Sequence, residues 1–197
     1  MQKIFFPLAI ITFNFVCTGL FAQAKAELPF DWEKLLAKEI QVEPVKQADS
    51  NRPGVRMIFA VTAPQSLIWH TISNTEVGRE IFSQNKDMVI LEKKDTYEIA
   101  TYNMNLFFKK YQYILRRTMD KANLRVDWIN TGGDLKYICG FWQIRQTPAP
   151  DTFLLIYEVF IDSGFRVPQW LQQIIQMQES KKMALTLRNW LESQGNE

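Results

Sequence analysis

The side chains that most often carry catalysis or bind metal are scarce in this sequence. It holds one histidine, His70, and two cysteines, Cys17 and Cys139. Nucleophilic triads and zinc sites depend on histidine or on paired cysteines, and the sequence lacks Gly-x-Ser-x-Gly, His-Glu-x-x-His, Gly-x-Gly-x-x-Gly and phosphate-binding motifs. We therefore expect no metal and no cofactor. We interpret His70 as a surface or structural histidine rather than a ligand contact, and Cys139 as a small buried hydrophobic residue rather than a reactive thiol.

Two adjacent arginines, Arg116 and Arg117, raise a question of charge burial. Neighbouring residues of a strand point to opposite faces, and alternation with Tyr113 and Leu115 makes Arg117 the inward one. An arginine among apolar side chains needs a counter-ion. The candidates are Glu98, Glu158 and the phosphate or carboxylate head of a ligand. The alternative interpretation is an exposed ion pair between neighbouring strands.

Composition and charge narrow the class of protein. The 197 residues are 47% hydrophobic and 13% aromatic, with 23 basic and 21 acidic side chains. These values are typical of one globular domain and exclude disordered and fibrous proteins. A formal net charge of +2, without a basic block, argues against a nucleic-acid partner.

The first 24 residues are typical of a secretory signal peptide. Lys3 supplies a positive start, residues 4–21 form a nearly uncharged apolar run, and Ala22-Gln23-Ala24 is a small-x-small cleavage site. A retained membrane anchor is the alternative, because the run is about long enough to span a bilayer. Cleavage predicts a periplasmic or secreted domain of residues 25–197. Only one cysteine would remain, so no intramolecular disulfide is expected.

Turn residues and β-branched or aromatic runs predict an α+β fold dominated by antiparallel strands. A short helix capped by Asp31 comes first, followed by a hairpin of residues 39–47 and 55–62. Pro64 begins a short helix and Asn74 begins another. Six further strand-like runs follow, at residues 88–93, 96–108, 111–119, 124–129, 135–145 and 152–162. Their short connections favour antiparallel neighbours, in a sheet of about seven strands.

The last strand and the helix after it show the clearest periodicity. Alternate residues of the strand are apolar and should face the interior, namely Phe153, Leu155, Tyr157, Val159 and Ile161. Pro168 begins a helix that extends to about Ser193, roughly 40 Å at about 1.5 Å per residue. The first half of this helix carries an apolar stripe that should pack on the sheet, formed by Trp170, Leu171, Ile174 and Ile175. The apolar residues of the second half turn to a different side.

Short motifs in a characteristic order connect these elements to a known family. They are residues 61–69 (VTAPQSLIW), 110–117 (KYQYILRR), 140–144 (GFWQI), 157–159 (YEV), 162–164 (DSG), 167–168 (VP) and 170–171 (WL). Over residues 32–193 they resemble the lipid-binding START superfamily, also called SRPBCC. The resemblance is to exported bacterial START-like proteins related to coenzyme Q-binding and polyketide cyclase-type domains. Relatives often carry an aspartate with a Tyr-x-x-Trp element, and an Arg-Asp pair. This chain has Asn74 with residues 77–82, and Lys109-Lys110, at those places.

The resemblance implies a helix-grip fold, in which a curved sheet wraps around the long C-terminal helix. The two short helices would form a partial lid over an apolar tunnel for a hydrophobic ligand. The expected ligand-binding residues are Trp69, Met104, Tyr113, Leu115, Arg117, Trp142, Ile144, Tyr157, Val159, Trp170 and Ile174. Each of them also fits ordinary core packing.

Three functions are compatible with such a tunnel. The first is a non-enzymatic, monomeric periplasmic carrier or sensor of a lipid or isoprenoid-like molecule, with transient membrane contact. The second is a cyclase or lyase that uses polar groups such as Tyr113 and Arg117. The third is an interaction domain whose cavity is filled by its own side chains. Abundant apolar residues and few catalytic ones favour the carrier.

Overall fold

The fold is described by a computed structural model for residues 30–82, 85–106, 109–164 and 168–195. The side chains of residues 104–106, 109 and 169 are not part of the description. The compact unit begins at Asp31. The expected signal peptide lies outside the described residues and stays a prediction.

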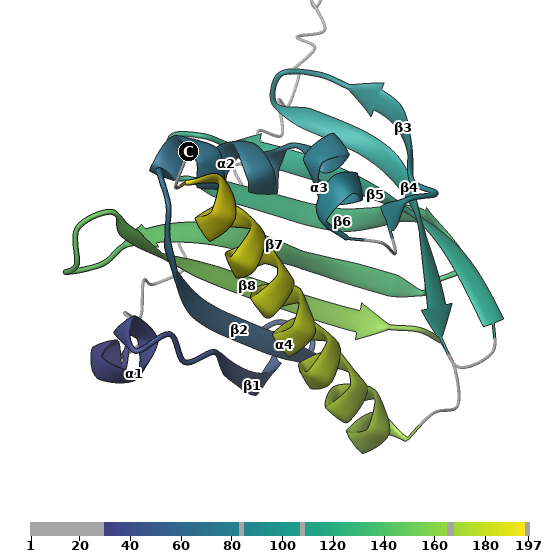
Figure 1. Cartoon of the computed structure of the whole chain (residues 1–197). Coiled ribbons are helices and arrows are strands. Elements are labelled where there is room, and N and C mark those ends of the chain that lie inside the picture. Colours follow the sequence, from purple (N-terminus) through teal and green to yellow (C-terminus); the bar gives the residue numbers. More distant parts are fainter. Residues whose placement is uncertain (1–29, 83–84, 107–108, 165–167, 196–197) are drawn as a thin grey trace, which may run out of the picture. The chain divides into compact units, whose positions relative to one another are not determined.

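In the described residues, eight antiparallel strands form one sheet in the order β1-β2-β8-β7-β6-β5-β4-β3. The strands are β1 (Gln41–Lys46), β2 (Pro53–Thr62), β3 (Val89–Lys93), β4 (Tyr97–Leu106), β5 (Lys109–Asp120), β6 (Arg125–Gly133), β7 (Tyr137–Gln146) and β8 (Thr152–Asp162). Pairing of β2 with β8 brings the first hairpin beside the last strand (Figure 1). This confirms the predicted antiparallel sheet, with one strand more than about seven.

Strand β6 extends further than the sequence predicts. Residues 131–134 have the composition of a turn, but β6 continues to Gly133, which pairs with Tyr113. Gly133 has a φ of +99°, and a Cβ there would lie 2.4 Å from the Gln112 carbonyl oxygen. The glycine therefore lets the ladder continue where another residue would end it.

Helices accompany the sheet at the positions that the sequence predicts: α1 (Trp32–Leu36), α2 (Gln65–Ser73), α3 (Thr75–Ile81) and α4 (Gln169–Gln194). Asp31 caps α1 by accepting from the Lys34 amide at 3.3 Å, and Pro64 precedes α2. Helices α2, α3 and α4 lie on one face of the sheet, and α4 crosses it diagonally (Figure 1). The helix-grip architecture is confirmed.

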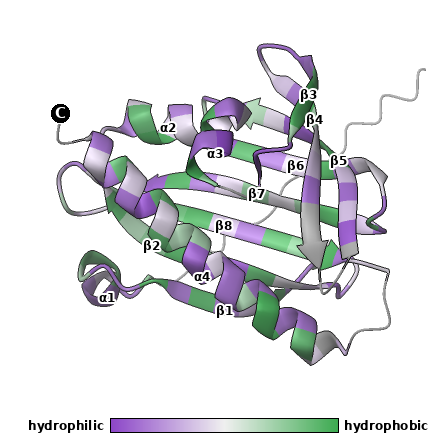
Figure 2. Cartoon of the chain, turned by 45° about the vertical axis from the view of Figure 1, so that its right-hand side comes forward, coloured by the Kyte–Doolittle hydropathy of each residue, from purple (hydrophilic) through white to green (hydrophobic). Residues whose placement is uncertain are grey.

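The core lies between this face of the sheet and the second half of α4. Buried residues of β2 and α4 pack there, namely Met57, Phe59, Val61, Ala184, Leu187 and Leu191. The predicted inward set of β8 is confirmed, since each member belongs to this core or packs against it. Residues on the other face of β8, such as Leu154 and Ile156, are buried as well. They pair across the ladder with Ala60 and Ile58 of β2, which makes both strands hydrophobic along much of their length (Figure 2).

Candidate functional site

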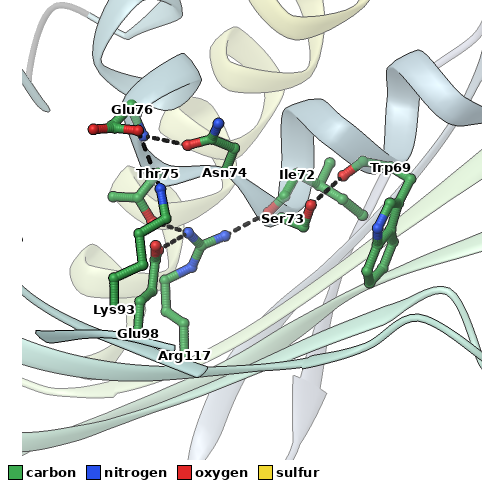
Figure 3. Close-up of polar contacts among 9 residues, drawn as sticks. All are labelled: Trp69, Ile72, Ser73, Asn74, Thr75, Glu76, Lys93, Glu98 and Arg117. Carbon is green, nitrogen blue, oxygen red and sulfur yellow. Dashed lines mark hydrogen bonds and ion pairs between the residues drawn. The ribbon is translucent and has the colours of Figure 1, made fainter. Parts of the chain in front are cut away.

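Arg117 of β5 lies beneath the junction of α2 and α3 (Figure 3). Glu98 of β4 is opposite it in the ladder, so the two side chains share the inner face. Arg117 Nη1 donates to Glu98 Oε1 at 2.5 Å, and the two residues are 8% and 0% exposed. The inward orientation is therefore confirmed, with Glu98 as the counter-ion. Glu158 lies on the other face of β8, where Arg56 Nε donates to it at 2.7 Å.

The guanidinium of Arg117 also anchors the helix junction. It donates to the Thr75 hydroxyl at the start of α3 and to the Ile72 carbonyl near the end of α2. Asn74, between the two helices, caps α3 by accepting from a backbone amide through its side chain. Because Glu98 compensates the charge of Arg117, the buried arginine needs no anionic ligand.

Aromatic rings from four strands pack together on the same inner face. The ring of Trp142 lies 4.6 Å from that of Tyr157 and 6.4 Å from that of Phe59, and the ring of Trp128 lies 5.4 Å from that of Tyr157. Gly140 is opposite Trp128 in the ladder, and a Cβ there would lie 2.7 Å from the indole. Glycine leaves the space that the indole occupies, so the rings form a continuous apolar floor.

Tyr113 belongs to a second aromatic group. It lies opposite Tyr102 in the β4–β5 ladder, and the two rings stack with centroids 5.6 Å apart at an angle of 17°. Burial raises the pKa of Tyr102, and the nearby charge of Arg117 lowers it by a smaller amount. Burial also raises the pKa values of Tyr113 and Tyr157. All three therefore remain neutral hydroxyl groups at physiological pH.

Tyr113 and Tyr157 combine a deep position with remaining accessible surface. Each lies near the middle of its strand on the face covered by helices, yet each is only half-buried. Leu115 and Trp142 on the same face are buried. Neither tyrosine hydroxyl has a hydrogen-bond partner among the described residues. This part of the inner face therefore keeps some solvent-accessible surface around the two tyrosine side chains.

The first half of α4 packs less closely than the second half. None of the described side chains from Trp170 to Glu179 is buried, whereas Ser180 and several later residues are. Trp170 is 63% exposed and Ile174 is 45% exposed. The prediction that this apolar stripe packs on the sheet was wrong for these two residues. Figure 2 shows hydrophobic turns at the end of α4 that lies far from the C-terminus.

A surface pocket of about 370 Å³ opens beside Trp69. Its walls come from α2, from the turn between β3 and β4, and from the end of β5, namely Trp69, Ser73, Asp95, Thr96, Met119, Asp120 and Lys121. Trp69 and Met119 also pack against the core. The pocket therefore borders the interior at one end of the sheet.

The structure brings some of the expected ligand-binding residues together and separates others. Leu115, Trp142, Ile144 and Val159 are buried in the core, and Tyr113 and Tyr157 are half-buried above it. Arg117 is held by Glu98, Trp69 lies at the surface pocket, and Trp170 and Ile174 are exposed on α4. The side chain of Met104 lies outside the described part of the chain. A ligand contact at any of these residues stays a prediction.

Sequence reasoning missed Tyr102, Trp128 and Phe59, which complete the aromatic surface. Alternation along their strands could have placed each of them on a face. The face that turns inward, however, depends on which residues lie opposite in the neighbouring strand, and the sequence does not specify that register.

The described residues hold no group of three His, Cys, Asp or Glu side chains placed to bind a metal ion. Within the same residues, no helix is long and apolar enough to cross a membrane. His70 is exposed on α2, which confirms its interpretation as a surface histidine. Cys139 is half-buried rather than buried.

No family model matches the chain, and no curated protein matches it in sequence. Solved structures do match its fold. A START superfamily protein from Mycobacterium smegmatis is 16% identical, with a TM-score of 0.62 over 71% of this chain and 97% of that one. A STAR-related lipid transfer protein from Xanthomonas axonopodis is 14% identical, with a TM-score of 0.62 over 77% of this chain and 93% of that one.

The Zhui aromatase/cyclase from Streptomyces sp. R1128 has the same fold. It is 17% identical, with a TM-score of 0.59 over 71% of this chain and 93% of that one. Identities this low establish the architecture alone. The resemblance that the sequence motifs predict is thereby confirmed at the level of the fold.

Proposed function

We propose that this protein, whose fold is that of START/SRPBCC-type proteins, is an exported carrier of a lipid or another hydrophobic small molecule. The ligand would lie between the inner face of the sheet and the first half of α4. Export is proposed from the composition of residues 1–24. We further propose that the carrier is a monomer that contacts membranes transiently.

One observation carries this proposal: half-buried aromatic residues lie on the inner face, and none of residues 170–179 in the helix half on the same side of the sheet is buried. Tyr113 and Tyr157 keep accessible surface near the middle of their strands. Residues 168–178 contain no charged side chain, yet Trp170 and Ile174 are exposed. A protein that stays in water usually covers apolar surfaces of this kind. The apolar body of a ligand would cover both the tyrosines of the sheet and the exposed apolar residues of α4.

Membrane contact is proposed from the same half of α4. Trp170 is a large aromatic residue at the start of an uncharged helical segment, followed by Ile174 one turn later. Tryptophan is enriched at membrane–water interfaces. Brief docking of this segment would bring the ligand site to the bilayer without a spanning helix.

A second candidate function is a cyclase-like enzyme acting on a hydrophobic substrate. The shared fold of the Zhui aromatase/cyclase supports it, as do the hydroxyls of Tyr113 and Tyr157, which are neutral proton donors on the apolar face. An enzyme would convert its ligand and release a product, and turnover would be lost when either hydroxyl is removed. A carrier would return its ligand unchanged.

The test is native mass spectrometry with lipid extraction on the full chain, expressed in a bacterium and purified from the periplasmic fraction. The carrier proposal expects a stoichiometric hydrophobic molecule, recovered unchanged after extraction. A protein that is empty and binds no hydrophobic dye would contradict it, and would favour an interaction domain with a filled interior. Absence from the periplasmic fraction would contradict export.

A further inference from the structure

The charges near the proposed site are already compensated within the protein. The buried charged residues of the described chain are Glu98, Arg117, Glu158 and Arg188. Glu98 pairs with Arg117, and Glu158 pairs with Arg56 on the other face. A charged ligand head that enters this site would therefore leave water without finding a free counter-ion, which is energetically costly.

Arg188, the remaining buried cation, is held by its own contacts near the C-terminal end of α4, including the nearby charge of Glu192. Its Nη1 donates to the Lys38 carbonyl at 2.7 Å, and its guanidinium is 6.0 Å from the ring of Phe59. It follows Ile174 by about 20 Å along the helix, at roughly 1.5 Å per residue. The accessible part of the inner face around Tyr113 and Tyr157 thus has no buried cation without a partner among the described residues.

Two hydrogen-bond donors remain in that accessible part. The hydroxyls of Tyr113 and Tyr157 have no partner among the described residues. Both stand on the inner face of the sheet, Tyr113 on β5 and Tyr157 on β8, and burial keeps both neutral. A hydroxyl removed from water without a partner is costly. A bound ligand would satisfy these hydroxyls by presenting acceptor atoms.

We infer that the ligand is uncharged and carries acceptor oxygens of the carbonyl or ether type, to which the Tyr113 and Tyr157 hydroxyls donate. A ketone, a quinone or an ester accepts such hydrogen bonds without the desolvation cost of a carboxylate, a phosphate or an ammonium group. This inference rests on the proposed function and specifies the ligand class.

The test compares three molecules with the same chain and different heads: 2-dodecanone, dodecanoate and dodecylammonium. Each is titrated at pH 8 as a competitor of Nile red bound to the full chain. The variants are Tyr113→Phe, Tyr157→Phe and their combination. Tyr97→Phe is the matched control, because its hydroxyl donates to Glu92 at 2.7 Å and the residue lies on the other face of β4.

We expect 2-dodecanone to bind more tightly than dodecanoate and dodecylammonium. Each phenylalanine substitution at 113 or 157 should weaken it about three- to tenfold, the range of one net hydrogen bond. The Tyr97 variant should match the wild type. Tighter binding of either charged competitor, unchanged ketone affinity in the double variant, or displacement of Nile red by none of the three would overturn the inference. If Nile red itself does not bind, the proposed function fails first.

Discussion

Arg117 and Glu98 form an ion pair enclosed on the inner face of the sheet, and the same arginine holds the carbonyl of Ile72 at the end of a helix. The pair therefore joins three elements: β4, β5 and the junction of α2 with α3. Glu98 Oε2 has no partner among the described residues, so the carboxylate depends on this arginine.

Loss of one partner of this pair should destabilise the fold strongly. Glu98→Gln leaves Arg117 buried without a compensating charge, and we expect a loss of about 3–5 kcal/mol in the free energy of unfolding. The double variant Glu98→Leu/Arg117→Met should retain more stability than the single variant. Urea unfolding measures both. A Glu98→Gln variant within about 1 kcal/mol of the wild type would show that the pair is solvated in solution.

The glycine opposite Trp128 should tolerate no side chain. At Gly140 a Cβ would lie 2.0 Å from the Glu158 carbonyl oxygen and 2.7 Å from the indole of Trp128. We expect Gly140→Ala to cost about 3 kcal/mol or to prevent folding. Gly78→Ala is the matched control, because its Cβ would meet only Asn85 at 3.8 Å inside α3. It should be neutral or stabilising by up to about 1 kcal/mol. Equal thermal shifts would argue against the close approach of β7 and β8.

The two halves of α4 should respond differently to substitution. Trp170→Ser and Ile174→Ser alter exposed residues, so the free energy of unfolding should change by no more than about 0.5 kcal/mol. Affinity for Nile red should nevertheless fall at least about threefold, because apolar ligand contact is lost. Leu187→Ala, in the buried second half, should cost about 2–5 kcal/mol. Unchanged dye affinity in both serine variants would remove the first half of α4 from the site.

Stability at high pH should reflect Tyr113 and Tyr157, the two half-buried tyrosines of the inner face. Their pKa values are raised by burial, so the folded state keeps protons that the unfolded chain releases near pH 10. This contribution is complete below the unfolded pKa and is lost as the pH rises above it. We expect stability to fall above about pH 10. The fall should be shallower in the Tyr113→Phe/Tyr157→Phe variant. The free energy of unfolding of both proteins is measured as a function of pH, and tyrosinate absorbance follows the ionisation. Identical slopes of stability against pH in the wild type and the double variant would contradict this prediction.

The thiol of Cys139 should react slowly. Burial is the largest cause of the shift in the Cys139 pKa, and it raises that pKa. Less thiolate is therefore present at pH 8 than in an unfolded chain. Ellman's reagent should therefore modify the native protein more slowly than the urea-unfolded protein. Equal rates in the two states would mean that the outer face of β7 is open at this position.

Periodicity predicted the elements well, because it depends on local sequence. Alternation in residues 152–162 identified β8 and its inner face, and Pro64 and Pro168 marked the starts of α2 and α4. Alternation also placed Arg117 on the inner face. That its partner is Glu98, and not Glu158, depends on the register of β4 with β5, which no local pattern contains.

The exposed half of α4 could not be predicted for a related physical reason. Helical spacing shows which residues share a face, but not whether another element covers that face. Trp170 and Ile174 do share an apolar stripe, yet the packed part of the helix begins only at Ser180. Trp128 could not be predicted for the same reason, because its place on the inner face depends on the glycine opposite it in β7.

The most direct test of a ligand site on the inner face is to locate a bound ligand. A 2-dodecanone analogue with a diazirine in its chain would be photo-crosslinked to the full chain, and the labelled peptides mapped by mass spectrometry. If the ligand lies on the inner face, labelling should be saturable and should occur in peptides containing Tyr113, Tyr157 and residues 170–179. Labelling confined to the outer face around Arg56, or to the pocket beside Trp69, would contradict it.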